Sequence, residues 1–477
     1  MSVDADVIII GAGPTGLALG NFLGLRGLKA ILIEAREELI DFPRAVGIDD
    51  EAMRAMQALG LVDKVARHTV PDQRIRMVNG EGKLLSEINP TTREFGWPRR
   101  NGFVQPLVDR ELFEGLSRFD NVEVRFGCEA VSVTPGDDAV TVVGRGTDGV
   151  ETTLRGSYLV GCEGGRSLSR QAIGVEFEGR TNKNLGLVID VDNDPLGNPH
   201  AVFSGDPVKP FATLQLPHGI RRWEVGLPEG VSDDDEITEE IVYRALEPHV
   251  PDPRKLDVSR RRTYLSHARI AQKFRVGRVL LAGDAAHVMP VVAGQGWNSC
   301  IRDALNLGWK LDLVITGRAD ESLLDTYEQE RKPHVTDIVN LSVNMAKIMG
   351  NRSKVRAIVR DVAAKVINRF PKGRAYLSNQ NYKPLPRYGG VVVPSELPRS
   401  RSVFVAEDFR TRVGSLLPQP RVDTVDARGV LLDDATGSGW RILMWNNDPA
   451  YFLGEAAEQW KQLGGTSAMV VPSTQLG

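Results

Sequence analysis

A short glycine-rich segment near the start of the chain has residue types and spacing suited to binding a diphosphate. Residues 11–16 read G-x-G-x-x-G. In this pattern the first glycine permits a tight turn, the second lets a diphosphate approach the backbone, and the third lets a helix pack on a strand. Glu34 lies 18 residues beyond the last glycine, where a carboxylate can accept hydrogen bonds from a ribose. We expect a dinucleotide, either FAD or NAD, to contact Gly11, Gly13, Pro14, Thr15 and Gly16.

A second pattern, far along the chain, favours a flavin over a nicotinamide as the bound group. Gly283 and Asp284 follow the apolar run 279–282, so the carboxylate lies at the end of a predicted buried strand, where open α/β sheets bind ligands. A carboxylate there suits the ribityl hydroxyls of a flavin. The alternative is an aspartate that caps a helix. The first glycine pattern and the glycines that follow Asp284 favour the flavin.

The glycines after Asp284 lie at the predicted start of a helix, near residue 296. Unpaired N–H groups and the helix dipole at that point would stabilise negative charge on a reduced flavin. We expect Asn298 to hydrogen-bond the pyrimidine edge of the flavin, with helix capping as the alternative. Trp297 is expected beside the ring, with core packing as the alternative. The predicted cofactor contacts in this segment are Pro290, Gly294, Gly296, Trp297 and Asn298.

Hydrophobic patterning predicts the elements that must position these residues. Alternating apolar residues at 122–126 and 140–143 predict antiparallel strands. Helical periodicity covers 296–315 and continues past Pro333 to about residue 367, with a kink at the proline. Short β-branched or apolar runs predict buried parallel strands, which are expected at residues 7–10, 30–33, 159–161 and 279–282.

The order of these elements predicts an α/β fold, in which a Rossmann-like FAD-binding domain is interrupted by an antiparallel-sheet substrate domain. Residues 371–398 are rich in Pro, Gly and Tyr and are expected to form a linker. The β-α-β pattern beyond them predicts a small C-terminal α/β domain. The expected division is an FAD-binding part at 1–179, the substrate-binding sheet at 180–267, a second FAD-binding part with helical extension and linker at 268–385, and the C-terminal domain at 386–477.

Composition limits the classes of partner. Lys plus Arg is 59 and Asp plus Glu is 62, a net charge of −3, so nucleic acid is not an expected partner. The acidic start is unlike a signal peptide, and no apolar run is long enough to span a bilayer. Cys128, Cys162 and Cys300 have neither metal-ligand nor disulfide spacing, which suits a soluble cytoplasmic protein. No metal site is expected, and a homodimer is left open.

Several segments resemble the class A flavoprotein aromatic hydroxylases, whose fold is typified by para-hydroxybenzoate hydroxylase. Besides the glycine patterns, residues 43–51, 95–101, 105–106 and 324–331 are similar to the 3-(3-hydroxyphenyl)propionate hydroxylase group of that class. The resemblance implies FAD, NADH or NADPH, and ortho-hydroxylation of a phenol by O2 through a flavin C4a-hydroperoxide. It also implies a thioredoxin-like C-terminal domain. In the middle motif of the class, Glu163 stands here in place of the usual aspartate.

The resemblance also implies roles for single residues. The expected FAD contacts outside the glycine patterns are Arg36, Arg44, Gln105 and Arg110. Tyr264 and His267 lie where the inserted sheet rejoins the FAD part, and either is a candidate to hydrogen-bond the phenol oxygen. His287 is expected to be structural. A propionate tail would need cations, and the sequence does not choose among Arg99, Arg100, Lys209, Arg221 and Arg222.

Three other functions remain open from the sequence. The same fold hydroxylates larger phenols, polyketides and antibiotics. A flavin-binding protein that contacts a partner through its terminal domain is the second alternative, although the lack of any cysteine after Cys300 excludes a redox thioredoxin. An NAD-linked dehydrogenase is the third, and it would have no need of Asp284.

Overall fold

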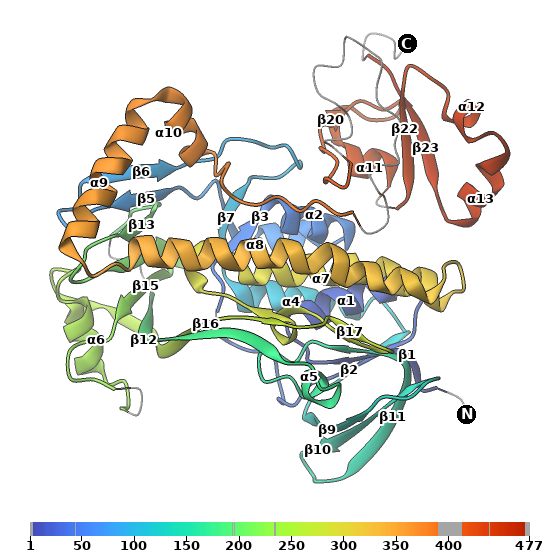
Figure 1. Ribbon diagram of the computed structural model, residues 1–477, viewed down its shortest axis with the longest axis horizontal. Helices are drawn as coiled ribbons and strands as arrows, with labels where there is room; N and C mark the ends of the chain where they lie inside the picture. The colour runs from blue at the N-terminus through green and yellow to red at the C-terminus, as the bar shows by residue number, and fades with distance from the viewer. Residues whose placement is uncertain are drawn as a thin grey trace.

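The structure is a computed structural model, and it describes residues 3–472 except 43, 193, 195, 233–234, 390–412 and 438. The side chains of residues 183 and 184 are also outside the description. The described chain forms two large sheets, a layer of helices, and a small C-terminal unit that projects from the rest (Figure 1). No described helix is long and apolar enough to cross a bilayer.

The first sheet carries both glycine loops and is mainly parallel. Its order is β17-β18-β11-β1-β2-β8, and β9 and β10 extend β11 in the antiparallel sense. In β1, Val7 and Ile9 pack into the helix layer, while Ile8 and Ile10 pack towards β9 and β10. Burial on both faces explains the continuous apolar run. The strands are β1 (Ala5–Ile10), β2 (Ala30–Ile33), β8 (Val122–Arg125), β9 (Cys128–Thr134), β10 (Val140–Gly146), β11 (Glu151–Gly161), β17 (Arg275–Val276) and β18 (Val279–Leu281).

The four predicted parallel strands are confirmed as β1, β2, β11 and β18, and the antiparallel strand predicted at 140–143 is confirmed as β10. The antiparallel prediction for 122–126 is wrong, because β8 pairs in parallel with β2 at the edge of the sheet. An edge strand in a partly exposed position alternates in polarity whichever way it runs. The alternation at 122–126 therefore indicates that the strand is partly exposed, and it does not indicate whether the strand pairs in parallel or antiparallel.

The second sheet is antiparallel except where β13 pairs with β5. One face packs on α6 through residues such as Leu187, Ile189 and Trp223. The opposite face carries Arg260 and Arg262, whose guanidinium groups lie over the Phe42 ring. Its strands are β5 (Ile75–Val78), β6 (Leu84–Ile88), β12 (Phe177–Asp192), β13 (Ala201–Ser204), β14 (Phe211–Gln215), β15 (Arg221–Gly226), β16 (Asp257–Ala271) and β19 (His287–Val288). Both β5 and β6 belong to residues 1–179, the expected first FAD-binding part, so this sheet is not built from residues 180–267 alone. The expected domain boundaries stay a prediction.

The helix predicted at 296–315 is confirmed as α7, and α8 runs beside it across the molecule (Figure 1). The periodicity beyond it divides between α8, which contains Pro333, and α9. The expected linker is corrected at its start, because residues 371–378 form α10 with Pro371 at its first position, where proline suits a helix. Its last part, 390–398, lies outside the described residues. The helices are α1 (Pro14–Leu25), α2 (Asp50–Ala58), α3 (Val62–Ala66), α4 (Gln105–Leu116), α5 (Leu168–Ala172), α6 (Glu239–Leu246), α7 (Gly296–Ile315), α8 (Asp325–Met349), α9 (Lys354–Arg369) and α10 (Pro371–Ser378).

A third, three-stranded sheet is formed by residues of the first part of the chain, and a small α/β unit ends the described chain. The small sheet joins β3 (Gly47–Asp49), β4 (Thr69–Pro71) and β7 (Arg100–Phe103). The terminal unit pairs β22 and β23 in parallel, and Arg54 on α2 binds it through a bidentate contact with Asp433 at 2.6 and 2.8 Å. Its elements are β20 (Arg421–Val422), β21 (Val430–Leu431), α11 (Leu432–Thr436), β22 (Arg441–Trp445), α12 (Pro449–Leu453), α13 (Ala457–Gln462) and β23 (Thr466–Val470).

Candidate active site

The loop between β1 and α1 has the geometry that its glycines predict. Gly11 has a φ of +104°, which disfavours any side chain. A Cβ on Gly16 would lie 2.0 Å from the Gly11 carbonyl oxygen, so only glycine lets α1 approach this closely. A Cβ on Gly13 would meet no atom within 4 Å. The space in front of Gly13, at the start of α1, fits a diphosphate group.

We expect Gly13→Ala to weaken FAD binding without disturbing the apoprotein. The added methyl group meets no protein atom, and the φ of −79° at this position is open to alanine. The methyl group does occupy the space that the diphosphate needs. Crowding of about 1 kcal/mol, the low end for overpacking, is roughly fivefold in Kd. Fluorescence titration of the apoprotein with FAD measures the change, with Gly226→Ala, also in open space, as the matched control. Equal FAD affinity in both variants would place the diphosphate elsewhere.

Glu34 follows directly after β2, beside this loop. One carboxylate oxygen accepts the Ala12 N–H at 2.9 Å, and the other accepts the Arg36 N–H at 3.1 Å. The half-buried carboxylate is thereby held at the loop with lone pairs left for a ribose. The side chains of Arg36 and Arg110 are exposed, and no hydrogen bond within the described chain holds either guanidinium here. Their expected FAD contacts stay predictions.

The Gly283–Asp284 loop lies against the first glycine loop. Gly283 has a φ of +62°, and a Cβ on it would lie 2.2 Å from Thr15 Oγ1. Asp284 lies in a 3-10 turn whose N-cap is Ala282, so the alternative of a helix-capping aspartate is excluded. Within the described chain its carboxylate makes one hydrogen bond, a long contact of 3.9 Å from Cys300 Sγ. A half-buried carboxylate with so little protein contact fits the hydroxyls of a ribityl chain.

A buried network holds this second loop. Asp303 on α7 accepts the Gly283 N–H at 2.9 Å and contacts His287 Nε2 at 2.7 Å, and its other oxygen accepts from Arg331 Nε at 2.7 Å. Burial raises the pKa of Asp303, but the charges of His287 and Arg331 outweigh it and lower the pKa to about 2. His287 has the structural contacts expected of it. The sequence assigned no role to Asp303 or to Arg331, although Arg331 ends one of the segments that resemble the family, because their partners are distant in the chain.

The middle motif, which begins at Glu163, also contacts the Gly283–Asp284 loop. Glu163 Oε1 accepts from Ser167 Oγ at 2.8 Å and from the Ser169 N–H at 2.6 Å, so the glutamate folds onto the start of α5. Arg170 donates to the Ala285 carbonyl at 2.8 Å and to the Gly165 carbonyl at 2.7 Å. The longer side chain of Glu163 is accommodated by these contacts within the protein.

The first turn of α7 faces open space. Gln295 provides no side-chain cap, Gly294 has a φ of +61°, and a Cβ on either Gly294 or Gly296 would meet no atom within 4 Å. Pro290 is buried just ahead of this turn. The unpaired N–H groups of the turn therefore border room in which a ring with negative charge fits. The buried Gln295 Oε1 also has no partner in the described part of the chain, and it is a candidate contact that the sequence analysis missed.

Asn298 and Trp297 are engaged within the protein. The Asn298 amide donates to the Gly47 and Gly294 carbonyls at 3.0 and 2.8 Å, and it accepts the Asp49 N–H at 3.0 Å. Both donors are therefore used and hold the Gly294 turn, while Oδ1 can accept one more hydrogen bond, so the expected contact with the flavin stays a prediction. Trp297 is buried against Phe103 and donates to Asp109 at 3.2 Å. The Trp297 side chain therefore packs in the core, which was the alternative to a place beside the flavin ring.

Gln105 shapes the loop that carries Arg44. Its Oε1 accepts the Arg44 and Ala45 N–H groups at 3.1 and 2.7 Å, and its Nε2 donates to Asp109 at 2.9 Å. Burial raises the pKa of Asp109 to about 7, against the lowering effect of these contacts. The Arg44 side chain is exposed, and its charge acts on Cys300, next to Asp284. Gln105 therefore positions Arg44, and contact of either with FAD stays a prediction.

The two candidates for the phenol oxygen lie on β16. Tyr264 pairs with Gly186, over which its ring lies, and the described chain gives its hydroxyl no hydrogen bond. Burial, with a smaller effect of Glu224, raises the pKa of Tyr264, so the hydroxyl keeps its proton. His267 instead contacts Thr181 Oγ1 at 3.0 Å. Tyr264 therefore keeps a donor that a ligand oxygen could use, and the roles of both residues stay predictions.

The structure distinguishes the five cations that were candidates to bind a propionate tail by their partners and their exposure. Arg221 is paired with Asp194, and Arg222 with Asp190. Lys209 is exposed. Arg99 and Arg100 line a small cavity beside Gly294 and Gln295. These two arginines are the ones near the first turn of α7.

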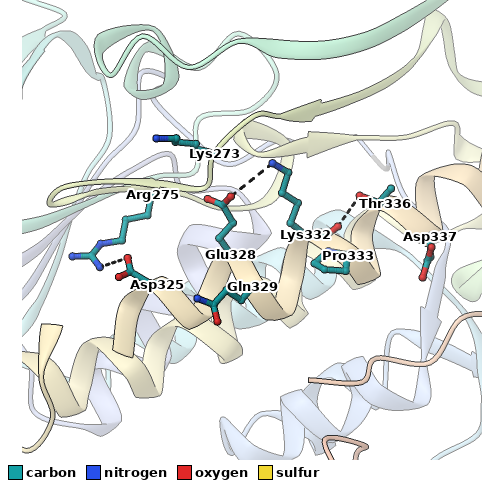
Figure 2. Close-up of a pocket in the computed structure, with 9 residues that line it drawn as sticks. All are labelled: Lys273, Arg275, Asp325, Glu328, Gln329, Lys332, Pro333, Thr336 and Asp337. Carbon is teal, nitrogen blue, oxygen red and sulfur yellow. Dashed lines mark hydrogen bonds and ion pairs between the residues drawn. The ribbon is translucent and has the colours of Figure 1, made fainter. Parts of the chain in front are cut away.

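An open surface hollow of about 740 Å³ between β17 and α8 is not part of this site. Figure 2 shows Arg275 directed to Asp325 and Lys332 directed to Glu328, contacts of 2.6 and 3.7 Å. None of the predicted site residues lines the hollow. Its charges largely pair with one another, and we assign no ligand to it.

Comparison with known proteins identifies the family of the chain. Residues 4–342 match the family described as FAD binding domain, and residues 414–477 match the HcaD C-terminal domain. A 3-(3-hydroxy-phenyl)propionate/3-hydroxycinnamic acid hydroxylase from Mycolicibacterium smegmatis is 46% identical over 473 residues, covering 99% of this chain and 82% of the relative. A protein of the same name from Comamonas testosteroni is 42% identical over 511 residues, covering 99% and 87%.

Solved structures agree in fold. Anhydrotetracycline hydroxylase from Streptomyces rimosus has a TM-score of 0.77 at 27% identity, covering 98% of this chain and 89% of that one. The p-nitrophenol 4-monooxygenase of Pseudomonas putida has a TM-score of 0.74 at 25% identity, covering 80% and 98%. The glycine loops, Glu34, Asp284 and the open turn of α7 border spaces that FAD fits. The chain therefore belongs to the family of FAD-dependent aromatic hydroxylases.

Proposed function

We propose that this chain hydroxylates a phenol that carries a short carboxylate side chain, with 3-(3-hydroxyphenyl)propionate and 3-hydroxycinnamate as substrates. The observation that carries the proposal is the 46% identity, over nearly the whole chain, to relatives named for those two compounds. Bound FAD would take a hydride from NADH or NADPH and activate O2 for transfer of one oxygen atom to the ring. The position hydroxylated is ortho to the existing hydroxyl.

In this proposal the protein supplies binding and positioning. Gly13 leaves room for the diphosphate, Glu34 accepts from the ribose, and Asp284 accepts from the ribityl hydroxyls. The first turn of α7 stabilises negative charge on the reduced ring through its N–H groups and dipole. Tyr264 hydrogen-bonds the phenol oxygen and so orients the ring. Arg36, Arg44 and Arg110 are proposed as contacts for the phosphates.

The test is substrate-dependent consumption of NADH or NADPH and O2 by the purified FAD-loaded protein. We expect 3-(3-hydroxyphenyl)propionate to raise the oxidation rate sharply, with a catechol product identified by mass spectrometry. Comparison of NADH with NADPH identifies the reductant. A protein that binds no FAD, or that gives no hydroxylated product with either acid, would contradict the proposal.

The second candidate function is hydroxylation of a larger polycyclic phenol, and the similarity to anhydrotetracycline hydroxylase favours including it. A panel that adds anhydrotetracycline to the two acids separates the candidates. Product from anhydrotetracycline alone would favour this second function while leaving the FAD assignment intact.

Finer features of the assembly are also proposals. The parallel pair β22 and β23, with helices between them, supports a thioredoxin-like C-terminal domain. Limited proteolysis tests the expected domain division, and sedimentation velocity tests the expected homodimer. The cytoplasmic location stays a prediction that fractionation of the host cell tests.

A further inference from the structure

A small cavity beside the first turn of α7 is bordered by several cationic side chains. It lies between β3 and β7 on one side and the Gly294 turn and residues 380–383 on the other. The charged residues that line it are Asp49, Arg99, Arg100 and Lys383, and the neutral Gln295 lies beside them. The cavity therefore adjoins the space where the flavin ring is proposed to bind.

Part of this charge is neutralised within the protein. Lys383 contacts Asp49 at 2.8 Å and Glu51 at 3.4 Å. Arg302 binds the same two carboxylates, with its Nε 2.8 Å from Glu51. Two cations therefore share two anions in a buried cluster. Lys383 has no unbalanced charge to offer a ligand.

Arg99 and Arg100 are different, because neither guanidinium makes a hydrogen bond or ion pair within the described chain. Arg99 is 8% exposed, and the Nε of each arginine is buried without a partner. Burial lowers the pKa of Arg100 to about 10, which still leaves it charged at neutral pH. An unpaired buried charge is strongly unfavourable. Arg99 is buried and Arg100 half-buried, and two adjacent guanidinium groups without an ionic partner suit an anionic ligand.

The nearest acidic group does not supply that anion. Asp50 acts on Arg99 electrostatically but lies beyond ion-pair distance, and one of its carboxylate oxygens is itself buried without a partner. Burial raises the pKa of Asp50 to about 7, so near neutral pH it is charged only part of the time. Tyr382, close to both arginines, also has its pKa raised by burial and is neutral.

We propose that Arg99 and Arg100 bind the carboxylate of the aromatic acid substrate and so select acids over neutral phenols. The inference rests on the proposed function and adds the residues that determine its specificity. Guanidinium groups bind a carboxylate through paired N–H donors in a fixed plane. The cavity has a volume of only about 10 Å³, room for about one water, so the carboxylate would meet the guanidinium groups at its opening, with the ring two or three bonds away beside the flavin space. Arg221 and Arg222, which have carboxylate partners, are not part of the subsite.

The test compares a charged and a neutral phenol in the FAD-loaded protein. KM and kcat are measured for 3-(3-hydroxyphenyl)propionate and for 3-ethylphenol, which lacks the carboxylate, in wild type, Arg99→Gln and Arg100→Gln. We expect each variant to raise KM for the acid by about 10- to 150-fold, the range for a hydrogen bond to a charged group, with little change for 3-ethylphenol. Arg100→Lys should recover part of the loss. The exposed Lys209→Gln is the matched control and should leave both KM values unchanged.

The outcomes separate the inference from the proposed function. If wild type hydroxylates the acid but the glutamine variants keep the full preference for it, the inference fails and the function stands. If the variants lose activity equally on both phenols, or lose FAD, the arginines serve the flavin or the fold and the inference also fails. If wild type hydroxylates only neutral polycyclic phenols, the proposed function fails together with the inference.

Discussion

Asp303→Asn is expected to lower the free energy of unfolding by about 3–5 kcal/mol, the cost of removing one partner from a buried ion pair. The reason is that Arg331, which is fully buried, would lose the carboxylate that neutralises it. Asparagine keeps only one acceptor oxygen, so either Arg331 or the Gly283 N–H and His287 would also face an NH2 group. Urea denaturation of the FAD-free protein, followed by circular dichroism, measures the change.

The control is Asp325→Asn, which removes a surface partner of Arg275 and should cost less than about 1 kcal/mol. The pH dependence of stability provides a second test of the role of Asp303. The pKa of Asp303 is about 2 in the folded protein against an ordinary 3.8, so its contribution is complete above about pH 4 and is lost as the pH falls towards 2. The stability difference between wild type and Asp303→Asn should shrink over that interval. A constant difference would mean that the carboxylate charge is not what stabilises the network.

Asp284→Ala is expected to leave the apoprotein as stable as wild type while weakening FAD binding by roughly 10- to 150-fold in Kd. The carboxylate has only the long contact from Cys300 within the described chain, so the fold loses little. The bound flavin would lose hydrogen bonds to a charged acceptor, worth about 1.5–3 kcal/mol. Titration of the apoprotein with FAD, monitored by flavin fluorescence, measures the affinity.

Asp337→Ala, at an exposed position on α8, is the matched control and should bind FAD as wild type does. Asp284→Asn should fall between the two, because it keeps an acceptor oxygen but loses the charge. Wild-type affinity in Asp284→Ala would remove the ribityl contact from the proposed site and leave the Gly283 loop with a structural role only.

The sequence alone was sufficient for the family and for the cofactor loops. Gly11, Gly16 and Gly283 are required because the backbone approaches too closely, or turns too sharply, for a side chain, and such local requirements are visible as residue types at fixed spacing. The helix at 296–315 was equally visible, because its periodicity extends over 20 residues.

Tertiary structure decided which polar groups are already paired. From sequence, Asn298 looked like a flavin contact, but Gly47 and Gly294 occupy its amide donors. Arg222 looked equivalent to Arg99, but Asp190 neutralises only the former. The partners in these contacts lie far apart in the chain or on adjacent strands, so neither spacing nor periodicity records them. The availability of a side chain for a ligand depends on which neighbours the fold brings within hydrogen-bond distance. Local sequence patterns do not show those neighbours.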